Sequence, residues 1–355
     1  MTYTQAEADI IVADSFDKLN YKCKKLFLAS LGSDDGDGQK YADALIKICG
    51  EGVYNKLKAQ FCDGAFRSFL LKEYEKRSIV CVTLKSALYP EGLKHIEVPP
   101  LVLYARGNYS LLSEETFAIV GSRKTAANIL EECKRFSQKL TDKFVIVTGV
   151  ADGADAAAAK GALPSGRIIC VLPGGHDSSC GGNIKVLREV ERRGLSISEF
   201  PPLFKAQRYT FILRNRIIAG LTKGVLVVSA AEKSGALNTA NYAADYGKDV
   251  FAFPYGLGVS SGAGCNKLIK NGAYLCDDVR DIFSVTGTVY EENKEDGLEP
   301  DERAIVELLS TEGEMHAQVI AEKINKPLGE TTVILAMLEI KGRVAKTGGN
   351  KFSIL

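Results

Sequence analysis

Short hydrophobic runs alternate with polar segments of helical length between residues 97 and 285. The runs are continuous, as in 117–120 and 225–229, and segments such as 128–141 between them are amphipathic. Continuous apolar strands that alternate with helices predict a parallel sheet covered on both faces, which is a doubly wound α/β domain. The predicted strands are 101–105, 117–120, 144–148, 168–172, 195–199, 225–229 and 249–253, and the clearest helices are 128–141, 183–193 and 236–246.

Other patterns flank this region. Residues 1 to about 75 have helical periodicity, and a strand-like run follows at 79–84. The C-terminal segment combines three short helical patterns with two runs around Gly348-Gly349 that resemble a β-hairpin, which predicts a winged helix. The predicted organisation is a helical domain (SAM or helix-hairpin-like) at 1–78, an α/β domain at 79–285, a polar, acidic linker at 286–300 and a winged-helix-like domain at 301–355. The helices predicted for the last domain are 301–310, 317–324 and 330–341.

Composition is that of an ordinary soluble globular protein. The chain has 355 residues, of which 46% are hydrophobic and 25% charged, enough for two or three domains. No apolar run is long enough to cross a bilayer, and the N-terminus lacks the features of a secretory signal. The nine cysteines form no C-x-x-C pair, which indicates reduced thiols and no metal site. We therefore expect a cytoplasmic protein with no membrane association.

The distribution of charge is more informative than the net charge of +1. Between positions 205 and 233, basic residues outnumber the single acid, Glu232. A solvated surface is the usual interpretation of such a run. The position of these residues relative to the predicted strand ends favours ligand contact instead. The basic residues are Lys205, Arg208, Arg214, Arg216, Lys223 and Lys233.

Two predicted strands end in turns that suit an anion. The strand 117–120 runs into Gly121-Ser122-Arg123, where glycine permits close approach to the backbone and arginine offers two donors to a phosphate. The strand 225–228 is followed by Lys233-Ser234-Gly235, which opens a helix. The alternative is a pair of tight strand–helix turns with solvent-facing cations. On these residues alone the two interpretations of the first turn are evenly balanced.

Arg214, Asn215 and Arg216 interrupt an otherwise apolar helical run at 211–220. An unpaired buried guanidinium is very unfavourable, so each arginine must reach solvent, an acid or a ligand. Because positions i and i+2 diverge by about 200° around a helix, we expect at most one arginine to point into a given site. Asn266 is a further polar candidate among glycines and lysines at 262–273.

No catalytic set is apparent. Asp155 is a possible acid but is better explained as a carboxylate at a helix N-terminus. His176 is a possible base, yet no Ser, Cys or acid completes a unit with it, which favours a loop histidine. Neither a P-loop nor a dinucleotide-binding G-x-G-x-x-G occurs. Cationic turns without a catalytic set favour binding of a phosphate backbone, so we expect a protein that is not an enzyme and has no cofactor.

Taken in order, the motifs of the α/β region resemble those of the DprA/Smf family. One motif would be weak, but six in order over about 150 residues are specific. The flanks agree, because 99–107 has the expected upstream pattern and both terminal regions match many members. The motifs are 120–123, 149–156 with 161–163, 198–202, 214–221, 233–240 and 266–273.

The resemblance implies an extended Rossmann-like domain that forms a homodimer. It also implies a basic pocket for single-stranded DNA and a role in loading the RecA recombinase, as in natural transformation. Leu268-Ile269 is the candidate for the dimer interface. The DNA contacts implied by the resemblance are Gly121, Ser122, Arg123, Arg214, Asn215, Arg216, Lys233, Ser234, Gly235 and Asn266.

The chain departs from the family pattern at three places. Asp152 stands where the family has arginine, Ala159 where it has histidine, and Gly181-Gly182 where it has a tyrosine–proline pair. An acid beside the pocket is expected to weaken phosphate binding or to pair with an arginine.

Two rival interpretations stay open. The nucleotide phosphoribohydrolases of the related fold carry P-G-G-x-G-T-x-x-E; Pro173-Gly174-Gly175 matches its start, but 177–180 supplies neither the threonine nor the glutamate. The other rival is a binding module for a small nucleotide, or for duplex DNA through the winged helix. Residues 301–355 hold seven basic and eight acidic residues, a poor phosphate footprint, which favours contact with a protein.

Overall fold

The structure is a computed structural model that describes residues 2–15, 50, 55, 63–149, 151–178, 183–289 and 298–355. Its contacts divide the chain into Met1–Val289, here called the α/β unit, and Tyr290–Leu355, the C-terminal unit. Most of the predicted N-terminal helical domain and of the acidic linker lies outside the described residues, as does Gly181-Gly182. No helix in the described ranges combines the length and apolar character needed to cross a membrane.

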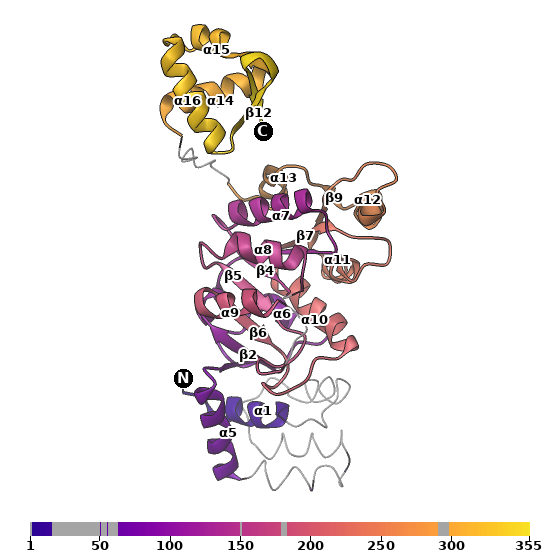
Figure 1. The fold of residues 1–355 in the computed structure, drawn as a ribbon. Coiled ribbons are helices and arrows are strands. Elements are labelled where there is room, and N and C mark those ends of the chain that lie inside the picture. Colours follow the sequence, from indigo (N-terminus) through magenta and orange to yellow (C-terminus); the bar gives the residue numbers. More distant parts are fainter. Residues whose placement is uncertain are drawn as a thin grey trace. The chain divides into compact units, whose positions relative to one another are not determined.

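The α/β unit is built on a nine-stranded sheet in the order β1-β2-β6-β5-β4-β3-β7-β8-β9 (Figure 1). The strands from β6 to β9 are parallel, whereas β1 and β2 pair antiparallel at one edge. The doubly wound α/β prediction is therefore confirmed, with an antiparallel edge that the hydrophobic pattern does not reveal. The strands are β1 (Val80–Thr83), β2 (Val102–Gly107), β3 (Thr116–Gly121), β4 (Val145–Thr148), β5 (Ile168–Val171), β6 (Leu195–Ser198), β7 (Gly224–Ser229), β8 (Asp249–Ala252) and β9 (Tyr274–Leu275).

Helices cover both faces of this sheet. Crossovers between parallel strands are right-handed, so α7, α8 and α9 pack together on one face while α6, α10 and α11 pack on the other (Figure 1). Since both faces are covered, every residue of β4 and β5 is buried, which explains their continuous apolar sequences. The helices are α6 (Glu91–Lys94), α7 (Ala127–Leu140), α8 (Ala154–Ala162), α9 (Ile184–Arg193), α10 (Arg208–Leu221), α11 (Ala236–Asp245), α12 (Ala263–Lys270) and α13 (Val279–Val285).

Two described helices of the N-terminal region pack at the antiparallel edge. These are α1 (Gln5–Asp14) and α5 (Gly64–Lys76), which contact β1 and β2. The Tyr104 hydroxyl in β2 donates to Asp14 at 2.9 Å, and the Cys81 amide in β1 donates to the hydroxyl of Tyr3 at 3.0 Å. The second bond satisfies a backbone N–H on the edge strand β1 that would otherwise be unpaired in the sheet.

The C-terminal unit is a winged helix, as predicted. Its three-stranded sheet has the order β10-β12-β11, and its core includes Ile305, Leu335 and Phe352. The elements are α14 (Pro300–Glu312), β10 (Met315–His316), α15 (Ala317–Lys323), α16 (Leu328–Ile340), β11 (Val344–Thr347) and β12 (Lys351–Ile354).

Candidate nucleic-acid interface

A pocket lies where the direction of the sheet reverses. The chain runs from β3 through β4 and β5 to β6, and then returns to place β7 on the other side of β3. Open α/β sheets bind ligands at this kind of switch point, beyond the carboxyl ends of the strands. The pocket there measures about 490 Å³ and is lined by the turn after β3, the start of α8, the face of α10 and the start of α11.

The floor of the pocket is formed by Asp155 and Arg214. Both side chains are buried, and Arg214 is held in place because its Nη1 donates to the Val171 carbonyl at 2.6 Å. Burial raises the pKa of Asp155, against the opposing effect of Arg214 and of backbone hydrogen bonds from Ala151 and Gly121. Asp155 and Arg214 both lie against Gly149, where an added Cβ would be 2.3 Å from Oδ2 of the one and Nη1 of the other, and the side chain of Asp155 does not cap α8.

The rim beside β3 carries two exposed cations, Arg123 and Lys124. The Arg123 guanidinium lies 5.5 Å from the centre of the Phe211 ring, a cation–π arrangement that orients it over the pocket. The turn below is held by backbone bonds, since the Ser122 amide donates to Ser229 at 2.8 Å and its carbonyl accepts from Ala154 at 3.2 Å. This rim therefore presents positive charge from a fixed backbone.

Gly153 allows that turn to close on α8. Its φ is +79°, and a Cβ there would lie 2.5 Å from the carbonyl oxygens of both Ser122 and Arg123. Any other residue would push the turn after β3 away from the start of α8.

The opposite rim is the N-terminus of α11. Ser234 and Gly235 precede this ten-residue helix, and its first turn supplies Asn238 and Thr239 to the pocket. The side chain of Asn215 donates to the Gly235 carbonyl at 3.3 Å and so joins α10 to this turn. A helix N-terminus adds partial positive charge to the pocket.

Seven of the ten predicted contact residues line this pocket, and three do not. Lys233 is exposed beside it without lining it. The residues brought together are Gly121, Ser122, Arg123, Arg214, Asn215, Ser234 and Gly235.

Arg216 points away from the pocket, contrary to its place among the predicted contacts. Its side chain is buried, forms an ion pair with Glu199, and donates from Nη1 to the Val98 carbonyl at 2.6 Å. The divergence of about 200° expected between positions 214 and 216 accounts for the difference.

Asn266 also lies elsewhere. Its amide accepts from the Tyr255 backbone N–H at 3.0 Å and donates to the Tyr255 carbonyl at 2.9 Å. These two bonds hold the conformation of the loop after β8, and Asn266 therefore has a structural role there.

Ten lining residues were not among the predicted contacts, and they include Lys124, Phe211 and Asn238. The signal for Phe211 is its spacing, because positions three and four apart share a helix face and Phe211 therefore lies with Arg214 and Asn215. Lys124 directly follows the predicted turn. No local pattern distinguishes Asn238.

The backbone of residues 201–206 packs directly against the loop that contains His176 and leaves no room for a ligand beside its glycines. A Cβ at Gly175 would collide with the carbonyls of Pro201 and Pro202, and one at Gly174 would lie 2.9 Å from the Ala206 amide. His176 is buried and donates from Nε2 to the Ser196 carbonyl at 3.3 Å; burial, with Arg106 nearby, lowers its pKa to about 4.

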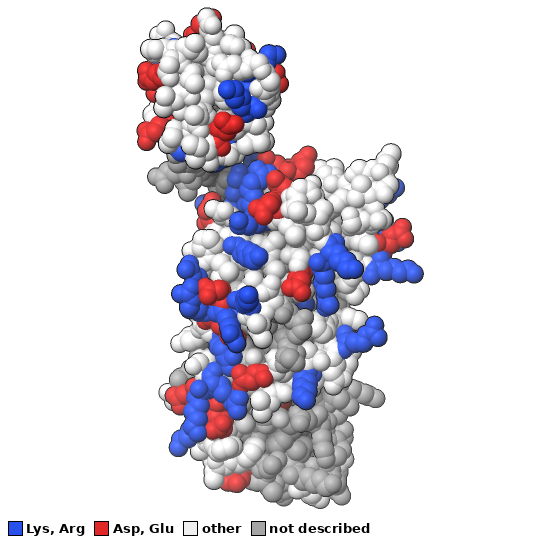
Figure 2. Space-filling model, viewed as in Figure 1, with Lys and Arg blue, Asp and Glu red and all other residues white. Residues whose placement is uncertain are grey.

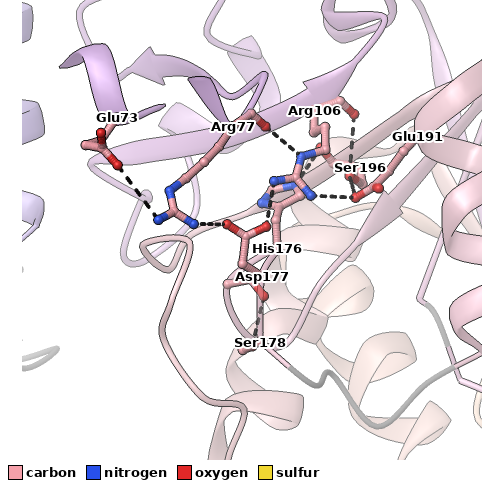
Figure 3. Close-up of polar contacts among 9 residues, drawn as sticks. Glu73, Arg77, Arg106, His176, Asp177, Ser178, Glu191 and Ser196 are labelled. Atoms are coloured by element: carbon pink, nitrogen blue, oxygen red, sulfur yellow. Dashed lines mark hydrogen bonds and ion pairs between the residues drawn. The ribbon is translucent and has the colours of Figure 1, made fainter. Parts of the chain in front are cut away.

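An ion-pair network surrounds this histidine (Figure 3). Asp177 accepts from Arg106 at 2.8 Å and from Arg77 at 2.5 Å, and so connects β2 to the end of α5. Arg106 also approaches Glu191 in α9 at 3.6 Å. His176 is thus a neutral, enclosed group beneath a structural network. Across the described part of the chain, no cluster of three or more His, Cys, Asp or Glu side chains is placed to hold a metal ion.

Two of the three departures from the family pattern fall on described residues, and neither lines the pocket. Asp152 is exposed in the loop before α8 and does not line the pocket. Ala159 is buried inside α8, at 1% exposure. The acid therefore lies outside the pocket and is not paired with Arg214.

Comparison with known proteins gives a consistent result. The profile of DNA recombination-mediator protein A matches residues 80–287, and that of the DprA winged helix domain matches 291–350. DNA processing protein DprA of Bacillus subtilis is 36% identical over 218 residues, covering 60% of this chain and 73% of that protein. Protein Smf of Escherichia coli is 33% identical over 286 residues, covering 74% of each.

Solved structures of the same kind of protein are also similar. DprA of Streptococcus pneumoniae superposes with a TM-score of 0.69 at 29% identity, over 82% of this chain and all of that one. DNA processing protein A of Helicobacter pylori, solved in a study of its single-stranded DNA binding mode, has a TM-score of 0.54 at 28% identity, over 58% of this chain and 94% of that one.

Proposed function

This chain belongs to the DprA/Smf family of DNA-processing proteins, and we propose that its switch-point pocket binds the backbone of single-stranded DNA. The observation that carries the proposal is the convergence of Arg123, Lys124 and the buried Arg214 on one pocket, from two sides of the reversal point. The similarity to the Helicobacter pylori protein, whose single-stranded DNA binding mode has been described, supports the same ligand class.

The surroundings of the pocket suit a single strand better than a duplex. Tyr209 and Ile212 on α10 are 51% and 49% exposed, and Phe211 lines the pocket beside them. Exposed aromatic and apolar side chains offer faces on which unpaired bases stack, and stacking tolerates any base. In a duplex the base faces are already stacked on one another. We therefore expect binding that depends little on sequence.

The charge outside the pocket supports an approach by DNA. Basic side chains outnumber acidic ones over α7, α8 and α9, the face seen in Figure 2. Several of them, including Arg135 and Arg192, are paired with neighbouring glutamates on the same helix. Such a surface steers a polyanion without specifying its sequence.

We propose binding without bond chemistry. His176, the one histidine that the sequence places at a strand end, is enclosed and neutral, and the glycines before it pack under the 201–206 backbone. A phosphoribohydrolase would need that loop to be open to a sugar. Asp155 is buried beside Arg214, and burial raises the pKa of its carboxyl.

The wider role follows from family membership. We propose that the protein acts in the cytoplasm, delivers single-stranded DNA to a RecA recombinase in homologous recombination, as in natural transformation, and functions as a homodimer. The best surface for a dimer is the edge at β9, where Tyr274 and Leu275 are 45% and 48% exposed. Leu268 and Ile269 are half-buried against the core instead, which makes them weaker candidates for the interface.

A competition experiment tests the DNA proposal. Unlabelled single-stranded DNA should displace a labelled oligothymidine at least about tenfold more effectively than duplex DNA of equal length or a nucleoside monophosphate. Affinity should also fall steeply as salt rises, because phosphate contacts release counterions. Equal displacement by the mononucleotide, or an affinity that does not change with salt, would reject the proposal.

A further inference from the structure

Asp155 is the only acid among the described residues that line the switch-point pocket. The residue is 6% exposed, and the other charged residues around the same cavity are Arg123, Lys124 and Arg214. A buried carboxylate repels a phosphate and so works against the ligand proposed for this pocket. The presence of Asp155 on the pocket floor therefore needs a physical explanation of its own.

Charged and titratable groups of several elements act on the Asp155 carboxyl. Arg214 acts from α10 and Arg123 from the turn after β3, and both favour the ionised form. Cys133 of α7 and Cys170 of β5 also interact with it, but burial raises the pKa of both thiols and keeps them uncharged. The ionisation of Asp155 is therefore set mainly by burial on one side and by two cations on the other.

The backbone holds this carboxyl in a fixed position. The N–H groups of Gly121 and Ala151 donate hydrogen bonds to it, and it packs with the Arg214 guanidinium against Gly149. Such donors favour the carboxylate, whereas burial favours the protonated acid and has the larger effect, so the pKa of Asp155 is raised. Because these influences oppose one another, charge that enters the pocket shifts the balance between the two forms.

A bound phosphate shifts this balance in one direction. Its negative charge lies beside Asp155 and offsets the charge of Arg123 and Arg214, so both effects disfavour the carboxylate. Resting on the proposed DNA function of the pocket, we propose that the Asp155 carboxylate takes up a proton from solvent when single-stranded DNA binds, so that the strand binds more tightly as pH falls. The coupling is reciprocal: the proton and the strand each increase the affinity for the other.

The sign of the effect follows from linkage. The pKa of Asp155 is higher in the complex than in the free protein, so affinity is greatest where the acid is protonated in both states and falls as pH rises through the two pKa values. The described pocket lining includes no histidine, and its arginines and lysine stay charged from pH 5 to pH 8. Within this range Asp155 is therefore the group of the described lining that links affinity to pH.

Fluorescence anisotropy of a labelled oligothymidine tests the coupling on the full chain. In 0.15 M salt, the affinity of the wild-type chain should rise at least about fivefold between pH 8 and pH 5.5, whereas Asp155→Asn, which is neutral at every pH, should rise by less than half as much. Asp152→Asn is the matched control, because Asp152 is an exposed acid in the loop before α8 and does not line the pocket. It should keep the wild-type pH dependence. Other groups that titrate in this range are common to all three proteins, so the comparison isolates Asp155.

Calorimetry counts the protons directly. Titration of oligothymidine at pH 6 in MES and in bis-tris, two buffers with different ionisation enthalpies, should show net proton uptake by the wild-type chain and by Asp152→Asn, and clearly less by Asp155→Asn. Asp155→Ser replaces that variant if the asparagine form does not fold. No uptake by the wild-type chain, or equal uptake by the folded Asp155 variant, overturns the coupling. Binding that responds to salt but not to pH rejects this inference alone, whereas the absence of salt-dependent binding rejects the DNA function itself.

Discussion

At the scale of single residues, Arg123 is the side chain best placed to contact a phosphate. It is exposed, oriented over Phe211, and attached to a turn held by backbone hydrogen bonds. Losing a charge-assisted contact costs about 1.5–3 kcal/mol, so Arg123→Ala should weaken binding of oligothymidine roughly ten- to hundredfold by fluorescence anisotropy.

The matched control is the double variant Arg343→Ala/Lys346→Ala in the wing of the C-terminal unit. Both residues belong to a net-acidic unit, where salt screens them, and the change should cost well under tenfold. A greater loss in the double variant than in Arg123→Ala, with both proteins folded, would place the DNA on the C-terminal unit.

Arg214 and Arg216 are two positions apart in the sequence, but we expect their replacement by alanine to have different effects. Arg216 and Glu199 form a buried ion pair, and removing one partner of such a pair typically costs about 3–5 kcal/mol. We expect Arg216→Ala to lower the free energy of unfolding by that amount in urea titration, while the protein that remains folded binds DNA normally. Arg214→Ala should instead weaken DNA binding. A specific loss of DNA affinity in folded Arg216→Ala would contradict this assignment.

At the scale of elements, the junction between the β3 turn and α8 depends on Gly153. A Cβ at this position would strike two carbonyl oxygens as well as strain a backbone with φ of +79°. Gly153→Ala should therefore displace the turn and weaken DNA binding at least about tenfold. Gly247→Ala is the control, because φ is +67° there but nothing lies within 4 Å of the added Cβ. If both variants bind DNA equally, the close approach does not shape the pocket.

At the scale of the whole molecule, His176 links folding to pH. Its folded pKa of about 4 lies below the ordinary value of 6.5, so the unfolded chain binds this proton more readily. The neutral histidine therefore supports the folded state above pH 6.5, and this contribution is lost as pH falls towards 4. A shift of this size corresponds to about 3 kcal/mol.

Between pH 7 and pH 4, the free energy of unfolding of the wild-type chain should fall by about 3 kcal/mol more than that of His176→Gln, as measured by urea titration. His95→Gln should leave the loss unchanged, because His95 is exposed. An acid sensitivity that stays the same in His176→Gln would mean that other groups control it.

Most strands of the α/β unit, its longer helices and the approximate position of its pocket could be predicted from the local sequence. Strand and helix periodicities are local, so runs such as 117–120 and 225–229 are visible without knowledge of their neighbours. The turns at 121–123 and 233–235 were each predicted to suit an anion, and the pocket lies between them, although Lys233 does not line it.

Which polar residues face that pocket depends on tertiary contacts. Arg214 and Arg216 are equivalent by local sequence, and their roles differ because Glu199 and the Val98 carbonyl lie on one side of α10 and Asp155 on the other. Asn266 likewise depends on Tyr255, and the antiparallel β1–β2 edge depends on which strand each run meets. These outcomes depend on contacts between residues distant in the chain, which no local pattern records.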